Sequence, residues 1–452
     1  MFYRKGMSNI MFKKTKIICT MGPACESEEM LKKLMLNGMN VARFNFSHGD
    51  HEEQKARFNR LVKVREELKL PIATLMDTKG PEIRLGVFAN GKEVLEDGAR
   101  FALTTEDILG TANRAAITYK NLKNDIEVGT HILIDDGRVE MIAEEITDTD
   151  IICKVVTGGK VSNRKGVNCP GAVLSMPYIN ETDYSDISFA AKEGFDFIAS
   201  SFTRCKEDVL EVRKIIEEAG AKTKIIAKIE NMQGIKNLEE IIEAADGIMV
   251  ARGDMGVEVP MEDVPVLQKD MIKKAVAHGK HVITATQMLE SMINNPRPTR
   301  AEVADVANAV YDGTDAVMLS GETAQGKYPI EALNMMVHIC ENTEEYLDYG
   351  GLLKKQAATR LSGIPSALGY ATISTAYNLN ARCVIAPTGS GSTARILSKF
   401  RPKMELIGAS PEERTLRRMQ IYWGVRPYES MQFETTEAIC GNAIALAKGP
   451  GS

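Results

Sequence analysis

The sequence predicts an α/β fold: a TIM (β/α)8 barrel that carries an inserted small β-barrel lid domain and is followed by a C-terminal α/β domain. Three observations predict this architecture. Short apolar runs alternate with amphipathic helical patterns, one long stretch interrupts them with hairpin-like alternation, and the pattern changes again after about residue 346. At 452 residues the chain is also too long for one compact core.

Eight short runs rich in aliphatic and β-branched residues predict the barrel strands. In order they read KTKIICTMG, NVARFNFS, PIATLMDT, FDFIASSF, KIIAKIE, GIMVARGD, HVITATQM and AVMLSGE. Helical patterns lie between them, for example at 27–37, 206–219 and 302–311. Eight strands that alternate with helices are typical of a TIM barrel, and we expect residues 1–80 and 178–345 to form it.

The stretch 81–177 has a different pattern of apolar and polar residues from the barrel sequence on either side of it. Apolar and polar residues alternate over VFANGKEVLEDGARFALTT, HILIDDGRVEMIAEEI and DIICKVVTGGKVSNRKGVN, which contain Asn-Gly, Asp-Gly and Gly-Gly turns. The pattern predicts a β domain inserted after the third barrel strand. Because βα loops open at the carboxyl ends of the strands, we expect this domain to act as a lid over the barrel mouth.

Residues 346–452 are expected to form the C-terminal α/β domain, with strands at CVIAPT, MELIGAS and GVRPY, while the final GPGS is expected to be a linker. A Gly-rich turn follows the first of these strands. Its hydroxyl residues, a candidate phosphate site, are Thr388, Ser390, Ser392 and Thr393. An ordinary turn with a helix cap is the alternative interpretation.

Composition and charge argue against several classes of protein. Net charge is −5 with no basic block, so no nucleic acid partner is expected. No apolar run is long enough to span a membrane, and the first residues lack the apolar segment of a signal peptide. The eight cysteines form no Cys-x-x-Cys pair, which favours reduced thiols and a cytoplasmic location.

Charged side chains gather at the carboxyl ends of the predicted strands, and we expect polar strand ends only there. Residues two apart share one face of a strand, so Lys228 should point the same way as Glu230. The same rule groups Arg43 with Asn45 and Ser47, Arg252 with Asp254, and Thr284 with Thr286, while Asp77 and Thr78 end the third strand. A plain ion pair between Lys228 and Glu230 is the simpler alternative.

The residue types at these strand ends indicate a chemistry. Glu230 and Asp254 are hard oxygen donors that leave coordination positions open, which suits Mg²⁺ or Mn²⁺. Lys228 and Arg43 supply the positive charge that a transferring phosphoryl group needs. The combination predicts phosphoryl or carboxylate chemistry at the mouth of the barrel.

Longer motifs resemble the pyruvate kinase family, in the right order, over about residues 13–447. They are TKIICTMGPACES, MNVARFNFSHG, LMDTKGPEIR, KGVNCPG, AKIEN, IMVARGDMGVE, ITATQMLESMINNPRPTRAE and DGTDAVMLSGETAQGKYP. The resemblance implies phosphoryl transfer from phosphoenolpyruvate to ADP, giving pyruvate and ATP in the final step of glycolysis. It also implies Mg²⁺ and K⁺ as cofactors, a homotetramer and a sugar-phosphate effector.

The resemblance further implies roles for single residues. Glu230 and Asp254 resemble the Mg²⁺ ligands, Lys228 the residue that stabilises the phosphoryl group in flight, and Thr286 a member of the relay that protonates the enolate. Implied substrate contacts are Arg43, Lys228, Gly253, Asp254 and Thr286; implied K⁺ ligands are Asn45, Ser47, Asp77 and Thr78; implied nucleotide contacts are Asn45, His48, Arg84 and Lys165. Glu82 is the residue type associated with a need for K⁺.

The chain departs from the family pattern in two places. Cys169 replaces the usual aliphatic residue in GVNCPG. The family's C-terminal domain continues past ALAK with further strands and an effector loop, so we expect a shortened domain here. The implied tetramer and effector site depend on that missing part.

Two other functions fit part of the pattern. A Mg²⁺-dependent lyase acting on an oxaloacetate-like acid would use Glu230, Asp254 and Arg43, but it gives Lys165 and the lid no role. A catalytically silent metabolite-binding protein fits a shortened C-terminal domain, but it would not need all the strand-end groups. Pyruvate release without ADP would favour the lyase, and phosphoenolpyruvate binding without ATP formation would favour the silent binder.

Overall fold

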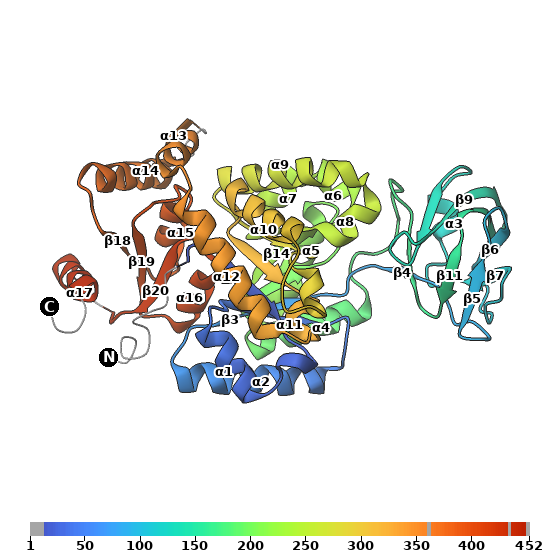
Figure 1. The fold of residues 1–452 in the computed structure, drawn as a ribbon, viewed down its shortest axis with the longest axis horizontal. Coiled ribbons are helices and arrows are strands. Elements are labelled where there is room, and N and C mark those ends of the chain that lie inside the picture. Colours follow the sequence, from blue (N-terminus) through green and yellow to red (C-terminus); the bar gives the residue numbers. More distant parts are fainter. Residues whose placement is uncertain (1–12, 359–362, 433–434, 449–452) are drawn as a thin grey trace.

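The computed structural model describes residues 13–358, 363–432 and 435–448. The GPGS end, interpreted above as a linker, lies outside the described residues, as do residues 1–12. Three parts follow one another along the long axis of the molecule: the C-terminal α/β part, the barrel and the inserted β part (Figure 1). Within the described ranges, no helix has both the length and the apolar character needed to cross a membrane.

Eight parallel strands close into a barrel in the order β1-β17-β16-β15-β14-β13-β3-β2, which confirms the predicted fold class. Each lies within one of the eight predicted runs. Their bounds are β1 Lys16–Thr20, β2 Val41–Asn45, β3 Ala73–Asp77, β13 Phe197–Ser200, β14 Lys224–Ile229, β15 Gly247–Ala251, β16 His281–Ala285 and β17 Ala316–Leu319.

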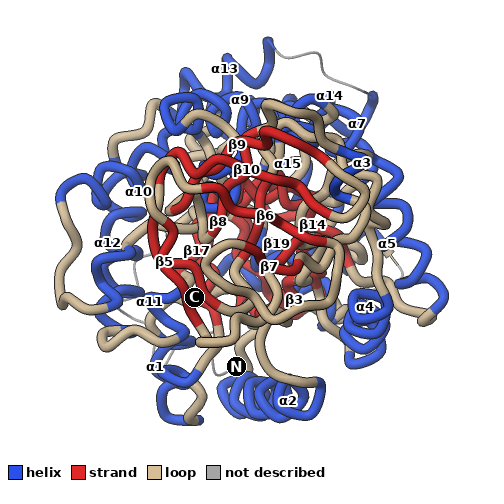
Figure 2. The backbone as a smooth tube through the Cα atoms, turned by 90° about the vertical axis from the view of Figure 1, so that its right-hand side faces the viewer, coloured by secondary structure: helices blue, strands red, loops and turns tan. Residues whose placement is uncertain are grey.

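Helices surround the strands, as the view along the barrel shows (Figure 2). They are α1 Glu28–Leu36, α2 His51–Leu68, α4 Glu181–Glu193, α5 Lys206–Glu218, α6 Met232–Lys236, α7 Leu238–Ala244, α8 Arg252–Glu258, α9 Val264–Ala277, α10 Arg300–Asp312, α11 Gly321–Ala324 and α12 Pro329–Glu345. Helix α10 shows the local signals: Thr299 and Glu302 form a capping box at its start, and Gly313 ends it with φ +98°.

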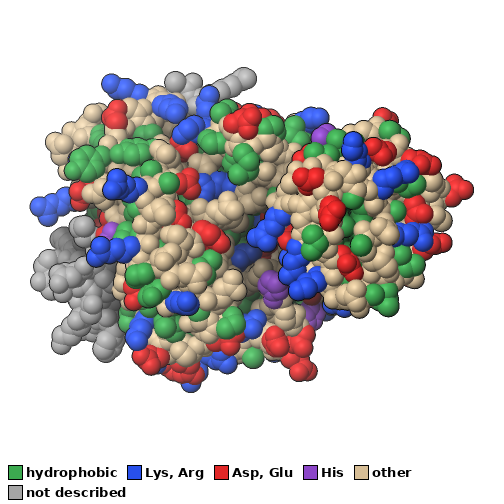
Figure 3. Space-filling model, turned by 45° about the vertical axis from the view of Figure 1, so that its right-hand side comes forward, with side chains coloured by type: hydrophobic (Ala, Val, Ile, Leu, Met, Phe, Trp, Pro, Cys, Tyr) green, Lys and Arg blue, Asp and Glu red, His purple; other side chains and the backbone are tan. Residues whose placement is uncertain are grey.

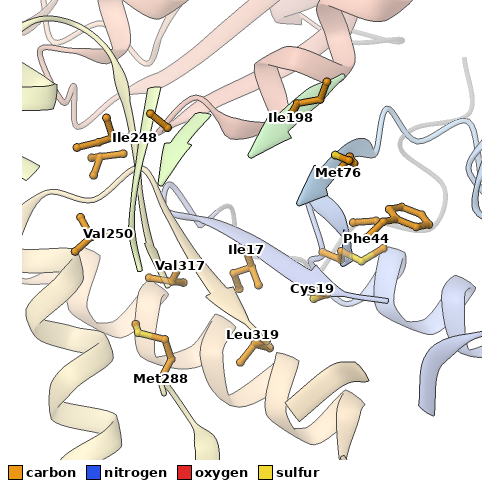
Figure 4. Close-up of a cluster of buried hydrophobic side chains, with 14 of the residues drawn as sticks. Ile17, Cys19, Phe44, Met76, Ile198, Ile248, Val250, Met288, Val317 and Leu319 are labelled. Carbon is orange, nitrogen blue, oxygen red and sulfur yellow. The ribbon is translucent and has the colours of Figure 1, made fainter. Parts of the chain in front are cut away.

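Two apolar layers hold the barrel together. One face of the strands packs against the helices through side chains such as Ile17, Phe44 and Val317 (Figure 4). The other face fills the barrel interior with side chains such as Leu75 and Ile226. Because successive strand residues alternate between these faces, every second side chain of a strand points into the barrel interior, up to the carboxyl end at the mouth.

The inserted part enters between β3 and α4. Its elements are β4 Ile83–Arg84, β5 Lys92–Leu95, β6 Arg100–Thr104, β7 Arg114–Ala116, α3 Leu122–Asp125, β8 His131–Ile134, β9 Val139–Ile146, β10 Asp150–Thr157, β11 Gly159–Ser162 and β12 Gly166–Asn168. Seven strands form one sheet in the order β4-β12-β8-β9-β10-β6-β7, and β11 pairs with β5. Residues such as Phe101 and Met141 give this part a core of its own.

The inserted part lies at the carboxyl end of the barrel strands (Figures 1 and 2). Asn168 Nδ2 of β12 donates a hydrogen bond of 3.1 Å to Glu258 Oε1 at the end of α8, which joins it to the barrel. Movement of this part as a lid stays a prediction.

The C-terminal part contains a parallel sheet in the order β18-β19-β20. Its elements are α13 Tyr349–Ala358, α14 Gly363–Asn378, β18 Cys383–Pro387, α15 Ser392–Ser398, β19 Glu405–Ser410, α16 Glu413–Arg418, β20 Val425–Glu429 and α17 Thr436–Lys448. Phe400, Leu406 and Tyr422 belong to the same apolar cluster as the barrel interior, so this part closes the amino end of the barrel.

The prediction that polar side chains occur only at the carboxyl ends of the strands is wrong. Asp196 and Asp315 directly precede β13 and β17 at the amino end, and both are buried. Arg417 Nε lies 3.0 Å from Asp196 Oδ1, and Arg401 Nη1 lies 2.7 Å from Asp315 Oδ1. The C-terminal part therefore supplies the partners that make these buried charges tolerable.

Candidate active site

The barrel interior turns from apolar to charged as the strands approach the mouth. On β14 the buried Ile226 is followed on the same face by Lys228, and Glu230, which directly follows the end of the strand, lies beside Lys228. On β3 Leu75 is followed by Asp77 in the same way. Strand alternation therefore correctly predicts that these charged side chains enter one shared space.

Lys228 lies at the centre of this space. Its Nζ is 2.9 Å from Glu230 Oε1 and 3.1 Å from Asp77 Oδ1, and it donates to Ser201 Oγ at 2.8 Å. Burial by itself lowers the pKa of Lys228, but the nearby charges of Asp77, Glu230 and Asp254 outweigh burial and raise that pKa above its ordinary value. The ammonium group therefore stays charged at the bottom of the mouth.

Asp77 holds two cations at once. Arg43 Nε donates to Asp77 Oδ2 at 2.6 Å, while Lys228 faces the other oxygen. Burial alone would raise the pKa of Asp77, but Arg43 and Lys228 lower it below its ordinary value. The ionised carboxylate fixes both cations toward the mouth.

Glu230 is fully buried and only partly satisfied by the protein. Its Oε2 accepts a hydrogen bond from Phe202 N at 2.7 Å, but none of the described residues donates a hydrogen bond to Oε1, which makes only the ion-pair contact with Lys228. Burial, assisted by the negative charge of Asp254, raises the pKa of Glu230 to about 8 despite Lys228. A cation beside this carboxylate would favour its ionised form.

The donor set fits a divalent cation. Glu230 offers an oxygen without a hydrogen bond, and Asp254 is close enough for its charge to raise the pKa of Glu230. No cluster of three or more His, Cys, Asp or Glu residues with metal-binding geometry exists in the ranges that the structure describes. A cation held by two carboxylates keeps its other positions for water and substrate, as Mg²⁺ prefers.

Two of the predicted strand-end groupings are wrong, because the strands end earlier than the pattern indicates. Strand β15 ends at Ala251, and Arg252 already begins helix α8 together with Asp254. Helical residues turn by about 100° rather than 180°, so Arg252 points away from the mouth and its Nη1 lies 2.6 Å from Asp305 Oδ1.

Strand β16 likewise ends at Ala285, so Thr284 and Thr286 do not act as a pair. Thr284 Oγ1 hydrogen bonds to Thr314 Oγ1, whereas Thr286 has a left-handed φ of +69°. Thr286 Oγ1 accepts from Gly253 N at 2.8 Å and donates to Ala285 O at 2.6 Å. Thr286 and Gly253, both predicted to contact the substrate, therefore lie side by side. A turn brings them together, not strand alternation.

The four predicted K⁺ ligands lie at the ends of β2 and β3. Asn45 is the cross-strand neighbour of Asp77, and its Oδ1 accepts from Ser47 N at 3.0 Å. Thr78 Oγ1 accepts from Ser201 N at 2.9 Å. Their role in K⁺ binding stays a prediction.

Basic and histidine side chains gather beside the hollow between the barrel and the inserted part (Figure 3). His48 is exposed in the turn after β2. Arg84 Nη1 donates to Arg164 O at 2.9 Å, and Lys165 Nζ lies 2.7 Å from Asp135 Oδ1. Nucleotide binding by these residues stays a prediction.

The candidate phosphate turn is closed mainly by its own hydrogen bonds. Thr388 Oγ1 accepts from Gly391 N at 2.9 Å, and Ser390 Oγ donates to Ser392 Oγ at 3.1 Å. Thr393 follows within α15, a helix of only seven residues. A cavity of about 310 Å³ opens beside Thr388, but Glu412 also lines it and would repel an anion. Anion binding here stays a prediction.

Ser201 also belongs to this site, although no sequence pattern predicted it. Its Oγ accepts from Lys228 and donates to Thr78 O at 2.7 Å, and it also contacts Asp77 Oδ1 at 3.1 Å. Ser201 therefore connects the candidate phosphoryl site to the candidate K⁺ site. Its position at the end of the predicted strand FDFIASSF could have indicated a place at the mouth, but a serine alone indicates no particular chemistry.

Comparisons with known proteins agree with this geometry. Residues 12–333 match the family model described as pyruvate kinase, barrel domain, and residues 366–451 match the model for the pyruvate kinase alpha/beta domain. The chain belongs to the pyruvate kinase family. Membership confirms the resemblance described above and makes the protein an enzyme, a transferase of the pyruvate kinase type.

Similar proteins in this family come from several organisms. The chain is 51% identical to a pyruvate kinase of Staphylococcus epidermidis and 49% identical to one of Staphylococcus aureus, over 97% of this chain and 75% of each relative. A solved pyruvate kinase structure from Cryptosporidium parvum superposes with a TM-score of 0.94 at 41% identity, covering 96% of this chain and 91% of that one.

Proposed function

We propose that the chain transfers the phosphoryl group of phosphoenolpyruvate to ADP. The bond between the enol oxygen and phosphorus breaks, a bond to the terminal phosphate oxygen of ADP forms, and the enolate left behind takes a proton at its methylene carbon to become pyruvate. The observation that carries the proposal is the buried Lys228, kept charged between Asp77 and Glu230 beside Arg43. Fixed positive charge stabilises the charge that develops during phosphoryl transfer.

Two cation sites belong to the proposal. Glu230 and Asp254 would hold Mg²⁺ or Mn²⁺, because one buried carboxylate oxygen of Glu230 finds no hydrogen-bond donor in the described chain. When bound, the divalent ion would supply Lewis-acid stabilisation of the enolate and phosphoryl oxygens. The proposed K⁺ ligands are Asn45, Ser47, Asp77 and Thr78.

The residues of the chain have distinct tasks in this proposal. Lys228 stabilises the transferring group, Arg43 binds the substrate phosphate, and the Thr286 hydroxyl belongs to the proton relay. Gly253 and Asp254 line the substrate carboxylate region, while Asn45, His48, Arg84 and Lys165 bind the nucleotide. Closure of the inserted part (residues 81–177) over the barrel (residues 1–80 and 178–345) would exclude water, which otherwise competes for the phosphoryl group.

Assembly and regulation follow the family in the proposal. Residues 346–452 would act as the regulatory domain of a cytoplasmic homotetramer, with a sugar phosphate at the turn that contains Thr388. A native mass measurement tests the assembly, and a dissociation constant for the sugar phosphate tests the effector site.

One assay tests the proposed reaction: ATP formed from phosphoenolpyruvate and ADP, with and without each cation. We expect ATP only when Mg²⁺ or Mn²⁺ is present, and a slower rate when K⁺ is replaced by a large organic cation. Pyruvate release without ADP would instead establish the lyase, and substrate binding without ATP would establish a silent binder. An unchanged rate without K⁺ would contradict the proposed K⁺ ligands.

A further inference from the structure

The turn after β16 has an unusual backbone. Thr286 has φ +69° and its neighbour Gln287 has φ +51°, so two consecutive residues with side chains are left-handed. This conformation is unfavourable for such residues, because Cβ approaches the backbone carbonyl oxygen. It persists only where surrounding contacts hold it, and such sites cluster in active sites.

The guanidinium group of Arg252 holds this turn. Its Nη2 donates to Thr286 O at 2.8 Å and to Gln287 O at 3.4 Å, and it contacts Met288 Sδ at 2.8 Å. One side chain therefore contacts three consecutive residues of the turn.

Arg252 is itself anchored from behind. Its Nη1 donates to Asp305 Oδ1 of α10 at 2.6 Å and to Gln268 Oε1 of α9 at 3.3 Å. The side chain is only 10% exposed. With both ends of the guanidinium group engaged, the carbonyl groups of the turn are fixed against two helices of the barrel.

The residue after Arg252 fixes the hydroxyl group carried by the same turn. Gly253 N donates to Thr286 Oγ1 at 2.8 Å. Two successive residues at the start of α8 thus hold the Thr286 backbone and the Thr286 hydroxyl, directly before Asp254.

We propose that Arg252 is a positioning residue for enolate protonation: its guanidinium group holds the left-handed Thr286–Gln287 turn and thereby aims the Thr286 hydroxyl at the substrate. This inference rests on the proposed function, in which Thr286 belongs to the proton relay. Lysine cannot replace arginine here, because a single ammonium group lacks the planar fork that reaches Asp305 and the turn carbonyl groups together.

Arg252→Lys and Arg252→Met test the proposal, and Arg401→Lys is the matched control. Arg401, at the opposite end of the barrel, also joins one carboxylate and one carbonyl group: it donates to Asp315 Oδ1 and to Gly313 O, both at 2.7 Å. The readouts are kcat, KM for phosphoenolpyruvate, the thermal midpoint, and deuterium uptake into the methyl group of pyruvate in D2O. Deuterium uptake reports the protonation step in reverse.

For Arg252→Lys we expect kcat and deuterium uptake to fall together by about 10²-fold, the size of a lost acid–base contribution, with KM within about threefold of the parent. Arg401→Lys should lower the thermal midpoint while leaving kcat within about twofold, since an intact mouth carries the chemistry. Retained deuterium uptake in both Arg252 variants would overturn the proposal, as would a fall in midpoint without a fall in kcat.

Crystal structures of the parent and Arg252→Met give a readout that does not depend on activity. We expect Thr286 and Gln287 to leave the left-handed region in the variant, and retention of both positive φ values would overturn the proposal. A parent that forms no ATP would instead contradict the proposed function, while the two crystal structures would still decide whether Arg252 holds the turn.

Discussion

The two ends of the barrel bury charged groups in different ways. At the amino end, Asp196 Oδ2 accepts from the Thr74 backbone at 3.0 Å while Oδ1 accepts from Arg417 at 3.0 Å. Asp315 there divides its oxygens between Arg401 and Val282 N. At the carboxyl end, the described part of the chain offers Glu230 Oε1 no hydrogen-bond donor.

We interpret this difference as one between groups that stabilise the fold and groups that we propose to bind ligands. The carboxylates at the amino end have their hydrogen bonds completed by the C-terminal part, so they hold that part on the barrel. At the mouth both oxygens of Asp77 have partners within the protein. Glu230 Oε1 has no hydrogen-bond donor among the described residues, so this oxygen is the one that we propose for a metal ion. Substitutions at the mouth should therefore change the rate, and those at the amino end should change stability.

The largest expected effect is that of Lys228→Met. Loss of the ammonium group removes the charge that stabilises the transferring phosphoryl group, so kcat should fall by about 10³-fold while phosphoenolpyruvate still binds. Steady-state kinetics with the coupled ATP assay measure this. Lys16→Met is the control, since Lys16 is a buried lysine at the amino end whose Nζ donates to Val425 O at 2.6 Å. A Lys228→Met rate within about tenfold of the parent, a barrier change of about 1.4 kcal/mol, would refute the role of Lys228.

Arg417→Met should lower the thermal stability and leave kcat almost unchanged, the reverse of what we expect for Lys228→Met. It leaves the Asp196 carboxylate buried without its cation, which costs about 3–5 kcal/mol. At about 1 °C per kcal/mol for a chain of this length, the thermal midpoint should fall by roughly 3–5 °C, with kcat within about twofold. Arg100→Met, which breaks an exposed pair with Glu145, should leave the midpoint unchanged. A large loss of kcat in Arg417→Met would break the separation between the two ends.

A smaller effect is expected from His281, which is buried at the amino end and stacks on Tyr422 with ring centroids 4.3 Å apart. Burial, with help from the positive charges of Arg395 and Arg401, lowers the pKa of His281 from 6.5 to about 3. The unfolded chain therefore binds the proton first as pH falls. The contribution of His281 to stability is complete above pH 6.5 and is lost by about 1.4 kcal/mol per pH unit toward pH 3.

Thermal midpoints between pH 7.5 and pH 5 measure this contribution. His281→Phe keeps an aromatic ring against Tyr422 but cannot titrate, so its midpoint should fall less steeply with acid than that of the parent. Equal slopes for the two proteins would show that His281 does not take up a proton on unfolding.

The sequence predicted the barrel and much of its mouth because both follow strand periodicity. Lys228 lies on β14 and Glu230 directly follows Ile229, the last residue of that strand, yet their side chains still meet at 2.9 Å as strand alternation predicts. Arg252 and Thr286 could not be placed in this way, because Arg252 already begins helix α8 and Thr286 has a left-handed φ of +69°, so the alternation stops at both residues.

The charges at the amino end were missed for a different reason. Asp196 finds its partner in Arg417, 221 positions away, and a local pattern carries no information about such a contact. Ser201 follows the end of a predicted strand, where functional side chains were expected. Serine, however, is too common at buried positions and in turns to indicate a site.

The proposal that Glu230 and Asp254 hold a divalent cation is tested most directly by measuring Mn²⁺ binding to the free enzyme by calorimetry. The parent should bind one ion per chain at the mouth, and Glu230→Gln and Asp254→Asn should each weaken binding by about tenfold or more. Glu344→Gln is the control, since both oxygens of this buried glutamate at the amino end already accept from the Lys14 and Thr15 backbone, at 2.7 and 2.6 Å. Unchanged Mn²⁺ affinity in Glu230→Gln and Asp254→Asn would contradict the account, because the mouth would then have no unfilled capacity for a metal ion.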